Sequence, residues 1–297
     1  MRSRTYHDQS VCGPYGSQRT DCDRDTDAGS DTDVHGAQVA TQIRTDTLLH
    51  SSLWVNIALA GLSILVFLYM ARTVRANRAR LIVGATLMIP LVSLSSYLGL
   101  VTGLTAGPIE MPAAHALAGE DVLSQWGRYL TWTLSTPMIL LALGWLAEVD
   151  TADLFVVIAA DIGMCLTGLA AALTTSSYAF RWAFYLVSTA FFVVVLYALL
   201  AKWPTNAEAA GTGDIFGTLR WLTVILWLGY PILWALGVEG FALVDSVGLT
   251  SWGYSLLDIG AKYLFAALLL RWVANNERTI AVGQRSGRGA IGDPVED

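Results

Sequence analysis

Long apolar runs alternate with short polar segments along most of the chain. Seven such runs lie at about 51–72, 81–104, 122–147, 153–175, 178–201, 215–239 and 250–274. Each is close to the ~20 residues that a helix needs to cross a bilayer. The pattern predicts an all-α membrane protein, a bundle of seven transmembrane helices.

The composition agrees with this prediction. Of 297 residues, 54% are hydrophobic and 14% are charged, and the mean hydropathy is +0.51, whereas soluble domains carry about 25% charged residues. The formal net charge of -6 gives no electrostatic footprint for nucleic acid, so we expect no such partner. Membrane lipid is the expected surrounding.

Basic residues near the helix ends predict the orientation, because short cytoplasmic loops collect Lys and Arg. They follow the first, fifth and seventh runs, as Arg72, Arg75, Arg78 and Arg80, then Lys202, then Arg271 and Arg278. The loops at 105–121 and 240–248 contain no Lys or Arg. We therefore expect an extracellular N-terminus and a cytoplasmic C-terminus.

The two ends of the chain differ from its middle. The segment DCDRDTDAGSDTD near the N-terminus is polar and acidic, and such a segment cannot bury enough apolar surface to offset its chain entropy. We predict a disordered acidic extracellular tail at 1–47, a seven-helix domain at 48–276 and a disordered cytoplasmic tail at 277–297. Cys12 and Cys22 could pair outside the cell or stay free, and Cys165 is expected to be a small core residue.

A charged residue within a membrane span indicates a functional site by default. Lys262 lies about twelve residues from the outer end of the last run, and Asp258 lies one turn before it on the same face. The two residues could form a structural ion pair that joins helices. Alternatively, Lys262 could carry a carbonyl cofactor as a Schiff base, as desolvated lysines can.

Aromatic residues could wall a long apolar cofactor. The sixth run holds Trp227, Tyr230 and Trp234 on turns that face a common side, and Trp132 in the third run could oppose them. Aromatic residues at helical spacing are more often ordinary core or interface residues. Combined with a lysine in mid-span, they favour a cofactor pocket.

Three of these motifs resemble those of the microbial rhodopsins. They are LDIGAKY in the last run, WLGYP in the sixth and RYLTWTLSTPM in the third. With EMPAAHALAGE between the second and third runs, they look most like the light-driven chloride pumps of haloarchaea. The resemblance covers about 48–276. It implies all-trans retinal on Lys262 as a protonated Schiff base, packed by Trp132, Trp227, Tyr230 and Trp234, and a homo-oligomer, commonly a trimer.

Arg128, Thr131, Ser135, Ile139 and Ala142 recur every three to four residues in the third run, so Arg128, Thr131, Ser135 and Ala142 fall on one helix face. The resemblance implies that proton-pumping relatives carry carboxylates at the positions of Thr131 and Ala142. This sequence has none there. A protonated Schiff base and Arg128 against Asp258 leave one positive charge unbalanced, and a chloride or other halide bound by Thr131 and Ser135 would balance it.

Each of these residues also has an ordinary interpretation. Serines and threonines in membrane helices commonly bond back to the carbonyl four residues earlier, and Arg128 could extend to the interface. Thr133 and Thr136 are assigned to back-bonding or cofactor contact. The resemblance suggests Thr223 on the exit path of the ion, with Arg220 and Gln125 as weaker candidates for its inner and outer ends.

The remaining polar residues have weaker roles in this interpretation. Asp161 is expected to be a hydrogen-bonded wall residue, and Arg181 and His115 are expected to be loop residues with solvated charges or helix-end contacts. Two other functions stay open. A sensory rhodopsin would signal to a membrane transducer, although sensors generally keep a carboxylate at the position of Thr131; a retinal-independent channel or receptor would need Lys262 only as the partner of Asp258.

Overall fold

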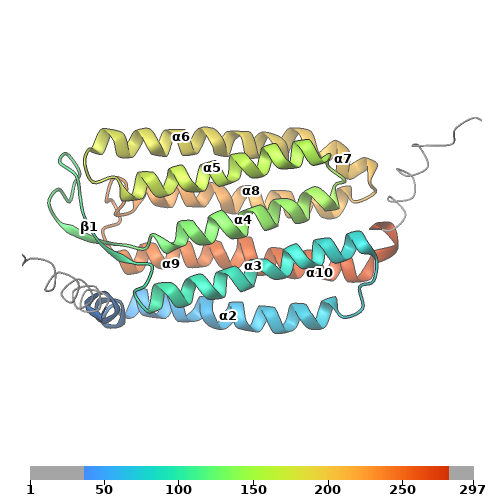
Figure 1. The fold of residues 1–297 in the computed structure, drawn as a ribbon, viewed down its shortest axis with the longest axis horizontal. Coiled ribbons are helices and arrows are strands. Elements are labelled where there is room, and N and C mark those ends of the chain that lie inside the picture. Colours follow the sequence, from blue (N-terminus) through green and yellow to red (C-terminus); the bar gives the residue numbers. More distant parts are fainter. Residues whose placement is uncertain (1–36, 281–297) are drawn as a thin grey trace, which may run out of the picture.

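The computed structural model describes residues 37–280. Its main elements are α2 (Thr47–Ala71), α3 (Asn77–Val101), α4 (Gly127–Leu146), α5 (Thr151–Leu173), α6 (Tyr178–Tyr197), a π-helix (Ala198–Lys202), α7 (Trp203–Ala209), α8 (Gly213–Leu236), α9 (Val247–Asp258), a second π-helix (Ile259–Leu264) and α10 (Phe265–Asn275). The long helices run side by side (Figure 1).

These elements form seven membrane-length columns, as predicted. Six helices in the described part are long and apolar enough to cross a bilayer. The seventh column is α9 and α10, joined by the π-helix at Ile259–Leu264. The column ends at the opposite end of the bundle from the start of α2 (Figure 1), as an odd number of crossings requires.

Side-chain caps fix where several columns begin. Asp46 accepts a hydrogen bond from the Leu49 backbone N–H, and Asp150 accepts one from that of Ala152. Ser177 and Ser246 cap α6 and α9 in the same way. Such caps satisfy N–H groups that have no partner within the helix. The polar residues between the apolar runs therefore define the helix starts.

The third column is shorter than the apolar run predicts. Residues 121–124 do not belong to the helix. They form β2 (Asp121–Ser124), which pairs antiparallel with β1 (Gly107–Glu110). Val122 and Leu123 are buried in this hairpin, so hydrophobicity here reflects packing on the end of the bundle and not a membrane span.

Residues 37–45 are helical, although the sequence analysis assigns them to a disordered tail. Val39 and Ile43, four residues apart on one helix face, are buried with Leu49, Tyr97 and Leu100. This one apolar stripe is enough to dock a short polar segment against the bundle. Residues 277–280 are also helical. The remaining tail predictions, with Cys12 and Cys22, lie outside the described residues.

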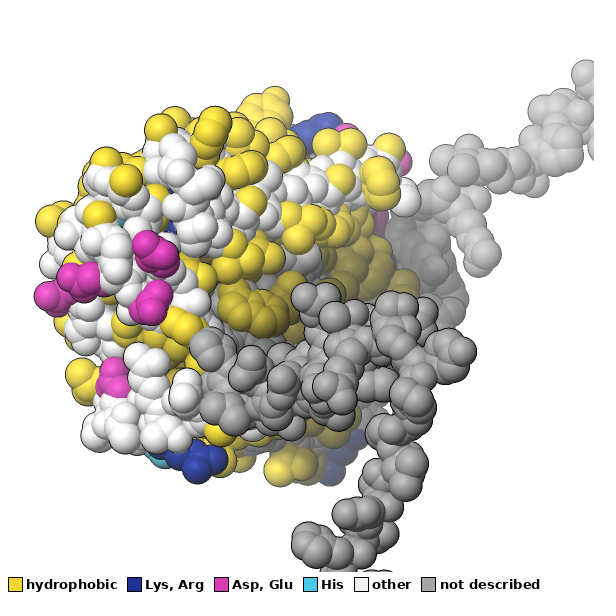
Figure 2. All heavy atoms as spheres, turned by 60° about the vertical axis from the view of Figure 1, so that its left-hand side comes forward, with side chains coloured by type: hydrophobic (Ala, Val, Ile, Leu, Met, Phe, Trp, Pro, Cys, Tyr) yellow, Lys and Arg dark blue, Asp and Glu magenta, His cyan; other side chains and the backbone are white. Residues whose placement is uncertain are grey.

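The surface of the bundle is predominantly apolar along its sides (Figure 2). Exposed leucine, valine and phenylalanine side chains occur on all the long helices, for example Leu65, Phe155 and Ile225, which are 68%, 72% and 65% exposed. Acidic side chains gather at the hairpin end (Figure 2), where Glu110, Glu120 and Asp121 are exposed. This distribution suits a bundle surrounded by lipid.

Candidate functional site

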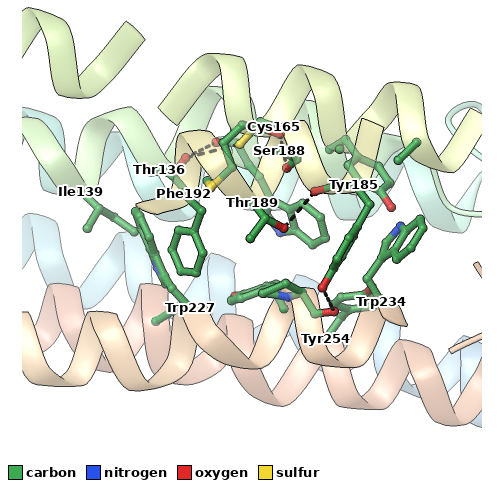
Figure 3. A pocket seen from close by; sticks show the side chains of 18 of the residues that line it. Thr136, Ile139, Cys165, Tyr185, Ser188, Thr189, Phe192, Trp227, Trp234 and Tyr254 are labelled. Carbon is green, nitrogen blue, oxygen red and sulfur yellow. Dashed lines mark hydrogen bonds between the residues drawn. The ribbon is translucent and has the colours of Figure 1, made fainter. Parts of the chain in front are cut away.

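A pocket lies among α4, α5, α6, α8 and the last column. The aromatic residues named from the sequence, Trp132, Trp227, Tyr230 and Trp234, all line it, together with Lys262. Trp227 and Phe192 lie toward one end and Trp234 and Tyr254 toward the other (Figure 3). Its long apolar shape and its single amine suit an elongated apolar molecule attached to a lysine.

Helices α5 and α6 complete the pocket with residues that sequence reasoning missed. They include Met164, Gly168, Tyr185, Ser188, Thr189 and Phe192. The Tyr185 hydroxyl donates to the Pro231 carbonyl at 3.2 Å, and its ring stacks on Trp234 at 4.8 Å between centroids. None of these residue types is unusual in a membrane helix, so only their positions around the pocket in the folded bundle reveal them.

Lys262 and Asp258 form a fully buried pair. Their side chains are 1% and 2% exposed, and Lys262 Nζ lies 3.0 Å from Asp258 Oδ1. Tyr230 donates to Asp258 Oδ1 and Tyr97 donates to Oδ2, both at 2.6 Å. Two phenols and one amine therefore surround this carboxylate, which satisfies a buried charge. Tyr97 had no signal in the sequence.

Arg128 lies at the start of α4 and is 3% exposed. Gln125 Oε1 accepts from Arg128 Nε at 3.1 Å and from Nη2 at 2.8 Å. The Arg128 Nη1 group donates to the Tyr97 hydroxyl at 3.2 Å, and Tyr97 links it to Asp258. Arg128 is therefore a buried part of the Lys262 network and not an interfacial residue, and Gln125 is its direct partner.

The threonines of α4 are committed to the backbone. Thr131 donates to the Gly127 carbonyl at 2.9 Å and contacts the Ser96 hydroxyl. Thr133 and Thr136 bond to the carbonyls four residues earlier at 2.7 and 2.8 Å. Back-bonding thus accounts for Thr131 and Thr133, whereas the single Thr136 proton has two acceptors within reach, the Trp132 carbonyl and Asp161 Oδ2.

Ser135 differs from these threonines. Its side chain is 0% exposed, and its Oγ has no hydrogen-bond partner among the described residues. An unsatisfied buried hydroxyl is unfavourable by about 1–3 kcal/mol. Ser135 therefore has a buried O–H group with no acceptor among the described residues, although it does not line the pocket.

On the far side of the pocket from Arg128, α8 carries Thr223 and Arg220. Thr223 is 1% exposed, and its Oγ has no partner among the described residues. The Arg220 guanidinium lies over the Trp221 ring at 5.3 Å. Neither residue lines the pocket. Ala142 of α4 is fully buried in the main hydrophobic core.

Asp161 is a hydrogen-bonded wall residue, in line with the sequence interpretation. Its Oδ2 accepts from the Thr136 hydroxyl at 2.7 Å, and the residue is 0% exposed. Thr136 and Cys165 beside it both line the pocket. Asp161 thus links α5 to α4 through Thr136. Among the described contacts, Lys262 forms its ion pair with Asp258 and not with Asp161.

Arg181 and His115 are buried, so the expectation of solvated charges is wrong, whereas the alternative of helix-end contacts is confirmed for Arg181, which bonds to Thr174 at the end of α5. Arg181 is 0% exposed and donates to the carbonyls of Glu239 and Thr174 at 2.7 and 2.9 Å. His115 is 4% exposed, and burial lowers its pKa. Both residues join loops that are distant in sequence, so their partners could not be read from spacing.

The Glu239 carboxyl group lies in the same loop cluster, just beyond the end of α8. Its Oε2 accepts from the Tyr129 hydroxyl at 2.6 Å. Burial raises the pKa of Glu239 above its usual value, and the Tyr129 bond and the charge of Arg181 oppose that rise. This end of the bundle therefore holds a second buried polar cluster, which borders the first at Arg128, since Arg128 and Glu239 line one small pocket.

The fold, the lysine in the last column and the aromatic pocket define a retinal-protein type of membrane bundle. The chain belongs to the family of bacteriorhodopsin-like proteins, whose family model matches residues 47–276.

Three relatives describe where the chain falls within that family. It is 71% identical to halorhodopsin of Halobacterium salinarum over 258 residues, covering 86% of this chain and 94% of that protein. A solved structure titled as halorhodopsin, a light-driven chloride pump, matches with a TM-score of 0.79 and 73% identity over 80% of this chain and 99% of that one. The light-driven proton pump of Coccomyxa subellipsoidea matches with a TM-score of 0.68 and 30% identity over 74% and 94%. Chloride and proton pumps thus share this fold, and the site must decide between them.

Proposed function

We propose that the protein is a light-driven pump that moves chloride, or another halide, into the cell across the plasma membrane. Retinal bound to Lys262 as a protonated Schiff base is the proposed light absorber, in the all-trans form before illumination. The high identity to halorhodopsin supports this function. The proposal also includes a homo-oligomer, with the family's trimer as the expected form.

The described residues fit retinal. The pocket reaches Lys262, and its walls are aromatic and aliphatic, with Trp132, Trp227, Tyr230 and Trp234 in contact with the space. When bound, retinal supplies a light-driven isomerisation that redirects the N–H bond at Lys262.

The observation that carries the choice of ion is the set of charges around Lys262. A protonated nitrogen there and Arg128 are two positive charges, and Asp258 is the one carboxylate that the described contacts place between them. The residue one turn past Arg128 on this face is Thr131, which cannot carry a negative charge at neutral pH. An anion restores neutrality in this low-dielectric site, and a proton does not.

Ser135 is the proposed ligand of the waiting anion, because its buried O–H group has no other partner among the described residues. Arg128 and Asp258 shape the field around that position, and Thr131 contributes a second hydroxyl when it releases the Gly127 carbonyl. Gln125 lies at the proposed entrance, where it holds Arg128. Thr223 and Arg220 lie along the proposed exit, where Thr223 has a free buried hydroxyl.

Light energy is required for the proposed direction. Moving an anion into a negative interior is opposed by ~2.3 kcal/mol per 100 mV. The orientation follows from the basic residues at one end, with Arg78 and Lys202 cytoplasmic and the acidic hairpin outside.

The test is the light-induced pH change of a suspension of expressing cells in chloride medium, with and without a protonophore. Inward chloride transport draws protons in passively, so the medium becomes alkaline, more strongly with the protonophore and not at all when sulfate replaces chloride. Acidification that the protonophore abolishes would instead identify an outward proton pump. No pH change from a coloured protein would favour a sensory rhodopsin.

A further inference from the structure

The direct hydrogen-bond partners of Arg128 are all neutral. They are Gln125, Tyr97 and Ser251, whose Oγ accepts from Arg128 Nη2 at 2.7 Å. In the described part of the chain no carboxylate forms an ion pair with Arg128. The guanidinium is thus buried without a direct carboxylate partner, although Asp258 and Glu239 lie close enough to interact with its charge.

Ser251 is the partner that joins Arg128 to the column of Asp258 and Lys262, since it lies on α9. Its Oγ is 2.7 Å from the Ser52 Oγ of α2, and Ser52 is also 2.8 Å from the Leu49 carbonyl. Both serines are 0% exposed. Neither hydroxyl can turn to water.

The ends of this chain of bonds fix its direction. A guanidinium only donates and a carbonyl only accepts, so Ser251 accepts from Arg128, and Ser52 donates to Leu49. The remaining proton, that of Ser251, then has Ser52 Oγ as its nearer acceptor, at 2.7 Å against 3.4 Å to Gln125 Oε1. This arrangement satisfies both hydroxyls and keeps a lone pair of Ser251 directed at Arg128.

We propose that Ser251 is a positioning residue for anion binding, which holds the Arg128 guanidinium with a neutral acceptor so that its charge remains available to the ion. A carboxylate at this place would hold Arg128 equally well and neutralise it. A serine hydroxyl that donates its own proton to another residue can accept from Arg128 without neutralising the guanidinium. The inference rests on the proposed anion site, to which Ser251 makes no contact of its own.

The test is a chloride titration of the purified, retinal-reconstituted full-length protein in the dark, followed by its absorption spectrum. Ser251→Ala should raise the chloride concentration for the half-maximal spectral shift by about tenfold or more, the scale of one lost hydrogen bond to a charged group. Ser251→Thr keeps the hydroxyl and should stay within about threefold of the wild type, a difference smaller than one hydrogen bond.

Ser255→Ala is the matched control. Ser255 is on the same helix, is also 0% exposed, and bonds to the Ser52 carbonyl at 3.4 Å, but it does not contact Arg128. Ser52→Ala leaves Ser251 in place and removes its nearer proton acceptor, while Gln125 Oε1 at 3.4 Å remains. This variant should weaken chloride binding by less than Ser251→Ala does. If Ser251→Ala forms no pigment, the Ser52→Ala titration tests the positioning role of Ser251 in its place.

The outcomes separate this inference from the function on which it rests. A wild-type pigment whose spectrum ignores chloride would overturn both. A wild type that responds normally, with Ser251→Ala matching Ser255→Ala or with Ser251→Thr as weak as Ser251→Ala, would overturn the positioning role alone. If Ser251→Ala forms no pigment, a Ser52→Ala titration equal to the wild type would also overturn it.

Discussion

Replacing Thr131 by Asp tests the choice of ion most directly. Thr131 is 3% exposed and lies one turn from Ser135 on the same face of α4. The substitution adds little volume, and it places a fixed negative charge beside the proposed anion position. The new carboxylate should take over the role of the bound anion as the second counter-charge to Lys262 and Arg128.

The size of the effect follows from the helix geometry. Side chains four residues apart on a helix are about 5–6 Å apart. At that separation two like charges repel by about 3 kcal/mol with an effective dielectric constant of ~20. An energy of about 3 kcal/mol corresponds to a loss of about two orders of magnitude in anion affinity.

The assay is a chloride titration of the absorption maximum of the reconstituted pigment. Thr131→Asp should show no chloride-dependent shift over the range that saturates the wild type. Thr131→Asn is the control, since it has the same shape as Asp without the charge and should retain the shift. An Asp variant that responds to chloride like the wild type would refute the charge argument, and so would an Asn variant as insensitive as Asp.

Three further predictions concern single side chains. Lys262→Ala should form no pigment with added retinal, because the only amine lining the pocket is removed; a visible band distinct from free retinal would contradict the assignment. Ser135→Ala should weaken chloride binding by about ten- to a hundredfold, the scale of a hydrogen bond to a charged group, with Ser135→Thr as the control that keeps the hydroxyl; equal titration curves for Ser135→Ala and the wild type would exclude Ser135 as a ligand. Because the pKa of Glu239 is raised from 4.5, the folded state retains a proton there that the unfolded chain has lost, so stability should fall as the pH rises from about 4.5 through the raised pKa. Glu239→Gln should remove that part of the slope in thermal melts recorded against pH, and an unchanged slope would argue against it.

The seven columns could be predicted from the sequence because hydrophobicity over about 20 residues is a local property. The hairpin was missed for the same reason. Val122 and Leu123 look like the start of a span, and only their pairing with β1 shows otherwise. The short helix at 37–45 was missed because Val39 and Ile43 are two apolar residues in a polar segment, and their burial depends on helices that come later in the chain.

The residues of the candidate site divide in a similar way. Lys262, Asp258 and Arg128 stood out because buried charges are rare in membrane spans. Tyr97 and Ser251 complete the same network but belong to residue types that are common in any membrane helix. Their roles depend on contacts between columns, which one sequence does not display.

The π-helix at Ile259–Leu264 affects how the last column tolerates changes in length. A π-turn holds one residue more than an α-helix of the same span, and such insertions are frequent at functional sites. Deleting one residue of this segment should let α9 and α10 join as one regular α-helix. The residues of α9 and of α10 that pack against neighbouring helices would still face them. A deletion within α4 would instead rotate every later residue of that helix by about 100°. The two π-helices are thus the places where the fold can lose a residue most easily, and in the one at Ile259–Leu264 such a loss would turn Lys262 away from its pocket.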